Sequence, residues 1–229
     1  MYRKFLNARS PLRLLEKSLH GGLGPGNLGV VVADHGVGKT SFLVGVALDE
    51  LLRKGRVLHV SLSHSVSHVR AHYDTVYEEL ASSTHLQDPR LIHSEIDRHR
   101  SIRVYPPGSL TTEKLRSAVK LESEAGARPT LLIIEGIDIG TLPRGDVEDL
   151  KALAGELEAE IWLEAASESE RDITVPKGVA ALDGLVSVIL ALEPDSEIVQ
   201  LRALKDHENP DLADLHVSLD PRSLLLVRS

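Results

Sequence analysis

Short apolar runs recur along the chain at wide intervals, and stretches with helical spacing of apolar residues lie between them. Short continuous runs of this kind are typical of strands that are buried on both faces, as in a parallel sheet. Strands are expected at Leu28–Ala33, Val57–Val60, Ile102–Tyr105, Leu131–Ile134, Ile161–Leu163 and Val186–Leu190. Their alternation with helices predicts an α/β domain of three layers, in which helices cover both faces of a mainly parallel central sheet.

The stretches between and after these strands give more detail. Apolar residues between 147 and 157 are spaced to lie on one face of a helix, and Ser109 is placed to cap another helix. Residues 198–204 and 215–227 alternate apolar and polar side chains and show few helix signals. We therefore expect them to form antiparallel strands, a β-hairpin that extends one edge of the sheet.

Length and composition narrow the class of protein. The 229 residues suit one domain, so we expect a basic helical segment over residues 1–20 and a single domain over residues 21–229. Hydrophobic residues make up 42% and charged residues 26% of the chain, as in soluble globular proteins. The absence of cysteine excludes disulfides, thiolate zinc sites and cysteine nucleophiles. No apolar signal region follows the basic start and no apolar run approaches the ~20 residues that span a bilayer, so a cytoplasmic protein is expected.

The net charge of -8 is unevenly distributed along the chain. Residues 1–20 contain five bases and one acid, whereas residues 141–172 contain ten acids and three bases. These segments are either solvated faces or complementary patches through which copies of the chain dock head to tail. The acidic balance argues against a general nucleic-acid coat.

The clearest chemical signal is the segment ADHGVGKT, residues 33–40, which lies between an expected strand and an expected helix over Ser41–Leu52. Glycines let backbone N–H groups turn toward an anion, and the positive end of the following helix dipole points at the phosphates. In such a loop the lysine reaches the β- and γ-phosphates and the threonine hydroxyl ligates Mg²⁺. The predicted nucleotide-binding residues are Asp34, His35, Gly36, Val37, Gly38, Lys39, Thr40 and Ser41. The alternative is a loop of this shape that binds nothing.

A metal ion at Thr40 calls for an acidic residue on a neighbouring strand. Leu131–Glu135 is an apolar strand that ends in an acid, so Glu135 is expected to complete the metal site. Glutamate is one methylene longer than the aspartate usual at this place, which would crowd the metal, and Asp138 is close enough in sequence to assist. The alternative is that Glu135 is only the polar end of a strand.

Residues 21–40, which read GGLGPGNLGVVVADHGVGKT, resemble without a gap the corresponding segment of the RecA-like ATPases, and within them the KaiC-like group. The order and spacing of the later strands extend the resemblance over almost the whole chain. It implies a RecA-like P-loop domain that binds ATP or ADP with Mg²⁺. It also implies assembly into hexameric rings or filaments, with the nucleotide between subunits.

The chain departs from this family where hydrolysis is performed. After the second strand the family has glutamates that activate the attacking water, whereas residues 61–65 here read SLSHS. On a late strand the family has Lys-x-Arg, whose arginine reaches the neighbouring subunit's γ-phosphate, whereas residues 205–207 read KDH. An arginine of this kind contributes ~10³–10⁵ in rate. The remaining catalytic candidates are His64, Lys205 and His207. His64 could act as the base only if it is neutral and correctly aimed, so hydrolysis is expected to be very slow or absent.

Histidines form a further cluster. His64, His68 and His72 are spaced to share one face of a predicted helix. Such a face binds a metal ion, with help from Asp74 or Glu78, or is a solvated or interface surface. The absence of cysteine favours the second reading.

Two other features concern ligands. Tyr73 and Tyr77 lie four residues apart, a spacing that fits packing in the core and also fits stacking on adenine. The loops 139–146 and 168–173, at the places where RecA-like recombinases bind DNA, contain acidic residues that would repel a phosphate backbone. Binding of nucleic acid is therefore not expected.

These observations predict a KaiC-like protein that binds ATP or ADP, hydrolyses ATP weakly or not at all, and acts in regulation or as a scaffold. Its expected partners are nucleotide and either further copies of the chain or another protein, with no membrane. The alternative is an active DNA-dependent or ring-forming ATPase of the RecA/RadA type, in which His64, His207 or an unrecognised carboxylate does the chemistry. A third interpretation is an interaction module whose loop binds nothing.

Overall fold

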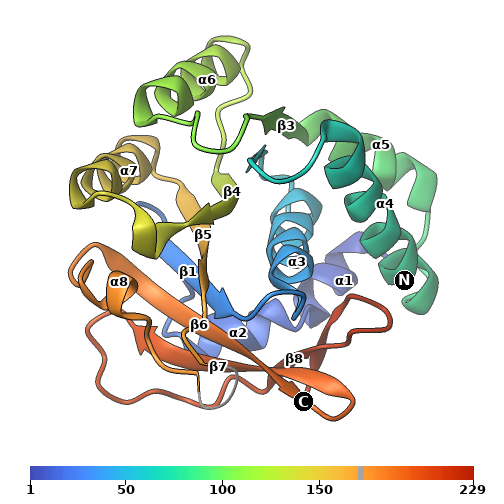
Figure 1. Cartoon of the computed structure of the whole chain (residues 1–229). Helices are drawn as coiled ribbons and strands as arrows, with labels where there is room; N and C mark the ends of the chain where they lie inside the picture. Colours follow the sequence, from blue (N-terminus) through green and yellow to red (C-terminus); the bar gives the residue numbers. More distant parts are fainter. Residues whose placement is uncertain (170–172) are drawn as a thin grey trace.

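The computed structural model describes residues 1–169 and 173–229, and the strands of these residues form one sheet (Figure 1). The strands are β1 (Leu28–Ala33), β2 (Val57–Ser61), β3 (Arg100–Val104), β4 (Leu131–Asp138), β5 (Glu160–Ala166), β6 (Val186–Asp195), β7 (Ile198–Asp206), β8 (Val217–Leu219) and β9 (Leu226–Arg228). The helices are α1 (Arg3–Arg9), α2 (Leu12–Ser18), α3 (Lys39–Leu52), α4 (Val66–Ser83), α5 (Pro89–His99), α6 (Thr112–Glu124), α7 (Arg144–Leu157) and α8 (Lys177–Ala180), and a 3₁₀ helix, η1, spans Ile139–Thr141.

The strand order is β3-β2-β4-β5-β1-β6-β7-β8-β9. Neighbouring strands from β3 to β6 are parallel, and those from β6 to β9 are antiparallel. The predicted α/β class, with a largely parallel sheet and antiparallel strands from the end of the chain at one edge, is confirmed.

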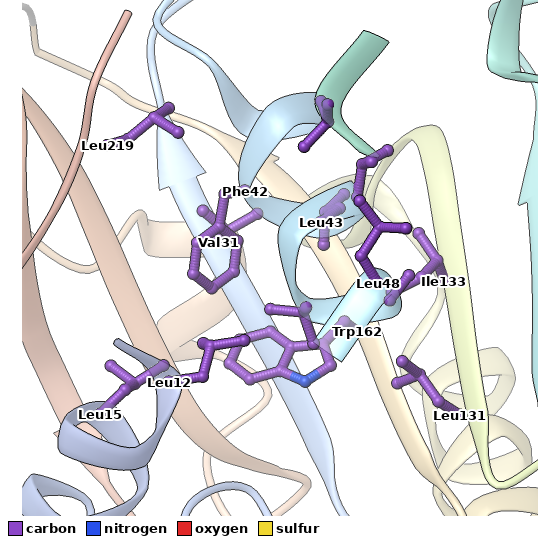
Figure 2. Close-up of a cluster of buried hydrophobic side chains, with 14 of the residues drawn as sticks. Leu12, Leu15, Val31, Phe42, Leu43, Leu48, Leu131, Ile133, Trp162 and Leu219 are labelled. Atoms are coloured by element: carbon purple, nitrogen blue, oxygen red, sulfur yellow. The ribbon is translucent and has the colours of Figure 1, made fainter. Parts of the chain in front are cut away.

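Strand β1 lies in the interior of this sheet, between β5 and β6, and all six of its residues are buried. Gly29 in β1 lies against the indole of Trp162, so closely that a Cβ atom there would be 2.7 Å from the ring. The same indole meets the Phe42 ring edge-on, with 5.5 Å between the ring centroids (Figure 2). The glycine thus makes room for the bulky pair that fixes α3 against the sheet.

Helices cover both faces of the sheet, and each face has its own core (Figure 1). Alternate side chains of β1 point to opposite faces, so Val31 packs with α3 whereas Val30 and Val32 pack with residues of α6 and α7. The α3 face is also covered by α1, α2, α4 and α5, and α8 packs on the opposite face. The arrangement is that of a domain with helices on the two sides of a central sheet.

The N-terminal helices belong to the α3 face. Leu6 of α1 and Leu12 and Leu15 of α2 are buried in its core. Arg3 forms an ion pair with Glu95, and Arg13 forms one with Asp49. These bases of residues 1–20 therefore pair with acids of the same chain.

Several element boundaries differ from the prediction. The helix expected after Ser109 begins later, at Thr112, because the hydroxyl of Thr111 accepts from Lys114 N at 3.2 Å and caps it, whereas the Ser109 hydroxyl donates to Pro106 O. Helix α3 begins at Lys39, inside the loop motif, and β4 and β5 each extend beyond their apolar runs.

Tyr73 and Tyr77 are buried core residues, which settles their role as packing side chains. Tyr73 lies against the His59 ring, with 3.0 Å between the tyrosine hydroxyl and His59 Nδ1, and Tyr77 donates to Pro89 O at 2.6 Å. In the described parts of the chain, no helix combines the length and the apolar character needed to cross a membrane.

Candidate functional site

The loop between β1 and α3 is shaped by glycines. Gly36 and Gly38 have φ values of +77° and +122°, in a region that other residues rarely adopt. Gly38 stands at the N-cap of α3, and a Cβ atom on it would lie 2.5 Å from Leu219 Cδ2. The first N–H groups of a helix have no partner within the helix. These donors and the positive end of the α3 dipole therefore lie just beyond the end of β1.

Lys39 is the first residue of α3, and its side chain folds along the loop. Its Nζ donates to Ala33 O at 2.8 Å and to Asp34 O at 3.1 Å. Asp34 Oδ1 accepts from His35 N at 2.7 Å. Backbone carbonyls thus hold the ammonium group next to the loop. An anion bound there would compete with these carbonyls for the ammonium group.

A hollow of about 590 Å³ opens beside this loop, at the carboxyl ends of β1, β4 and β5. We call it the central hollow. Its lining residues are His35, Gly36, Gly38, Lys39, Thr40, Ser63, His64, Gly136, Ile137, Asp138, Glu164, Ala165 and Ala166. Parallel strands bring their carboxyl ends to one edge of a sheet, and this edge is where ligands of open α/β sheets bind.

The predicted nucleotide-binding residues are placed in two groups. His35, Gly36, Gly38, Lys39 and Thr40 line the central hollow. The others, Asp34, Val37 and Ser41, are not among its lining residues.

Ser41 contacts a partly buried histidine of α4. Its hydroxyl lies 3.3 Å from His72 Nε2. Burial lowers the pKa of His72, and the nearby Glu135 carboxylate opposes that shift. Ser41 therefore ties the start of α3 to α4 rather than facing the central hollow.

Of the two predicted metal ligands, one lines the central hollow and the other does not. Thr40 lines the central hollow, whereas Glu135 is 1% exposed and is not among the lining residues. Glu135 Oε1 lies 3.5 Å from His59 Nε2. Burial opposes its ionisation, but His59 and Ser61 hold the pKa of Glu135 below its usual value. The described geometry thus places this carboxylate behind the hollow, beside a buried histidine.

The three catalytic candidates are also dispersed. His64 lines the central hollow, but Lys205 and His207 do not. Lys205 Nζ pairs with Asp183 Oδ1 at 2.5 Å. His207 places Nδ1 2.9 Å from Asp206 Oδ1 and Nε2 3.1 Å from Leu23 O.

The predicted histidine face is incomplete. Helix α4 begins at Val66, so His64 precedes it, although the His64 and His68 rings stack with 4.3 Å between centroids. His72 turns inward to Ser41, as described above. Asp74, which was expected to assist, contacts His93 Nε2 at 2.9 Å instead. The three histidines therefore do not form one shared face.

Glu164 is a residue of the central hollow that the sequence interpretation missed. It lies on β5, in register with Val31 of β1 and Asp138 of β4, and its Oε1 accepts from Gly136 N at 2.6 Å. Burial raises its pKa, and the neighbouring Lys39 charge and the Gly136 N–H act in the opposite direction. The available signal was a lone acid after the apolar run Ile161–Leu163, which continues the strand instead of ending it.

The acidic loops at this edge are only partly described. Asp138 uses Oδ1 to accept from Gly140 N at 2.8 Å and Oδ2 to accept from Ala166 N at 3.1 Å. In the loop 168–173, Glu168 accepts from Lys177 N at 2.8 Å, and residues 170–172 lie outside the described part of the chain.

A scan of the chain against models of protein families finds no match, and a search of curated proteins finds none either.

Proposed function

We propose that the chain is a KaiC-like protein of RecA fold that binds ATP or ADP with Mg²⁺ in the central hollow and hydrolyses ATP weakly or not at all. The observation behind this proposal is the glycine-shaped loop between β1 and α3, which presents Lys39 and Thr40 to a hollow at the carboxyl ends of parallel strands. The role that follows is regulatory or scaffolding, in which nucleotide stabilises one conformation or assembly.

The chemistry of the lining fits a nucleotide. The phosphates would be held by the loop N–H groups and by the Lys39 ammonium, which would exchange its carbonyl partners for phosphate oxygens. Thr40 would ligate Mg²⁺, and a magnesium ion would neutralise phosphate charge. The Glu135 carboxylate, behind the hollow, would act on the metal only through intervening groups.

The strand order supports the resemblance to RecA-like ATPases. Strand β5 separates β1, which leads into the loop, from β4, which contains Glu135. The two strands expected to supply phosphate and metal contacts are thus one strand apart, with their carboxyl ends at the same edge.

The positions of the catalytic candidates support weak hydrolysis. Ser63 and His64 stand beside the loop where the family has glutamates. Lys205 and His207, which the resemblance would direct to a neighbouring subunit, are held by Asp183, Asp206 and the Leu23 carbonyl within the chain. Self-association stays part of the proposal, and size-exclusion chromatography with light scattering, with and without ATP, tests it.

Isothermal titration with ATP and Mg²⁺ tests nucleotide binding. Wild type should release or absorb heat with a saturable isotherm, and Lys39→Ala should weaken binding at least tenfold because the phosphates lose their cation. Lys120→Ala is the matched control, since this lysine is exposed on α6 and pairs only with Glu124 among the described contacts. A flat titration for wild type, with no thermal shift on adding ATP, would contradict the proposal and favour an interaction module.

A further inference from the structure

Glu164 has a position that the loop residues do not share. Strand β5 runs between β1 and β4, and Glu164 stands at its carboxyl end, where it lines the central hollow together with Lys39 and Thr40. Its carboxylate is close enough to Lys39 for the lysine charge to affect its pKa. A group bound to the loop would therefore have this carboxylate beside it.

The other acids near the loop are already engaged. Both oxygens of Asp138 accept backbone N–H groups, from Gly140 and Ala166. Glu135 is buried next to His59 and does not line the hollow. In the described part of the chain, Glu164 binds one backbone donor, Gly136 N, through Oε1. Among the described hydrogen bonds, no backbone N–H engages its second oxygen, Oε2.

We propose that Glu164 is the general base of a slow ATP hydrolysis, in place of the carboxylates that are absent at Ser63 and His64. This inference rests on the proposed binding of ATP in the central hollow. Glu164 would take a proton from a water molecule as the water oxygen bonds to the γ-phosphorus. The bond from that phosphorus to the β,γ-bridging oxygen breaks, ADP and inorganic phosphate leave, and Glu164 returns the proton to solvent.

The electrostatic surroundings of Glu164 suit a proton acceptor. Burial raises its pKa, and the carboxylates of Glu135 and Asp138 add to this shift, while the Gly136 N–H and the Lys39 charge limit it. A base accepts a proton more readily as its pKa approaches the working pH. The carboxylate is thus better prepared for this step than an exposed glutamate.

Glu164→Gln is the sharpest test, because the amide oxygen can still accept from Gly136 N and the side chain keeps its size. Single-turnover hydrolysis of radiolabelled ATP by excess protein gives the rate, and isothermal titration gives the affinity. A positioned general base contributes about 10²–10⁴ in rate. We expect the rate to fall at least ~100-fold in Glu164→Gln, with the dissociation constant for ATP within about threefold of wild type. Glu197→Gln, at an exposed position in the turn between β6 and β7, should match wild type in both.

The outcomes separate the two proposals. Wild type that binds ATP but releases no phosphate, or a Glu164→Gln variant that hydrolyses as fast as wild type, overturns the role of Glu164 and leaves nucleotide binding in place. Wild type that binds no ATP overturns both. If Glu164→Gln does not fold, Glu164→Asp replaces it. This variant withdraws the carboxylate by one methylene, so it should slow hydrolysis without loss of ATP binding, and an unchanged rate would overturn the role.

Discussion

A single added methyl group at Gly136 should measurably destabilise the protein. Gly136 lies in β4 where the pairing with β5 shifts between Ile134 and Asp138, and its φ is +80°. A Cβ atom there would lie 2.7 Å from Ser63 N and 2.9 Å from Ser63 Oγ. Gly136→Ala would therefore force an alanine into a left-handed conformation and against the backbone of the loop that follows β2.

The expected cost has two parts. A non-glycine residue in a sparsely populated backbone region costs of order 1–3 kcal/mol. Overpacking a close contact costs about 1–3 kcal/mol. The nearest atom is the backbone nitrogen of Ser63, which cannot shift as easily as the end of a side chain. We therefore expect a loss of about 2–6 kcal/mol in the free energy of unfolding.

Urea unfolding followed by tryptophan fluorescence measures this loss. Trp162 is the one tryptophan of the chain and is 2% exposed, so its emission reports unfolding of the α3 face. Gly155→Ala is the matched control, since Gly155 is in α7 and a Cβ atom there would meet nothing within 4 Å. The control should gain about 0.5–1 kcal/mol, as expected for alanine over glycine in a helix. A Gly136→Ala variant within about 0.5 kcal/mol of wild type, the range of a neutral substitution, would refute the reasoning about strain at this turn.

Two other substitutions probe the core and its pH dependence. Phe42→Ala should lower the free energy of unfolding by about 3–5 kcal/mol, because the ring is fully buried against Trp162. Circular dichroism during urea unfolding measures this loss, and a loss below ~1 kcal/mol would contradict the packing. Burial opposes the ionisation of Asp206, but hydrogen bonds from His207 and His20 depress its pKa. Asp206→Asn should therefore lower the free energy of unfolding at pH 7 by about 1.5–3 kcal/mol. A depressed carboxyl pKa stabilises the fold above the unfolded value near ~3.9 and loses that effect as the pH falls through the lower folded value. The difference between wild type and Asp206→Asn should therefore shrink by pH 3, and a difference independent of pH would contradict the assignment.

The sequence predicts most of the parallel strands well because they are short apolar runs buried on both faces, whereas the edge strand β3 is only partly buried. All six residues of Leu28–Ala33 are buried, and the loop after them has two glycines with positive φ before Lys39. Antiparallel strands near the end of the chain were also predictable, since the alternation in residues 198–204 gives one buried and one exposed face.

The candidate site is predicted less well, because hydrophobicity does not reveal which face an acid occupies. Glu135 is expected in the hollow, yet it is 1% exposed and lies beside His59. Glu164 is not predicted, because the apolar run that marks its strand stops at Leu163 while the strand continues to Ala166. The pairing between β4 and β5 shifts after Ile134, near both acids. The pattern of apolar and polar residues does not predict this shift.

The position of β1 in the sheet has a consequence for the order in which the protein folds. Leu28 pairs with Ile161 on one side and with Val186 on the other, so both partners of β1 are more than half the chain away in sequence. Contacts of such long range form slowly, because a large loop must close before any pairing is gained. Leu219, which lies against Gly38, is farther still along the chain. During synthesis the loop is thus made early, whereas the strands and side chains that pack against it are made late.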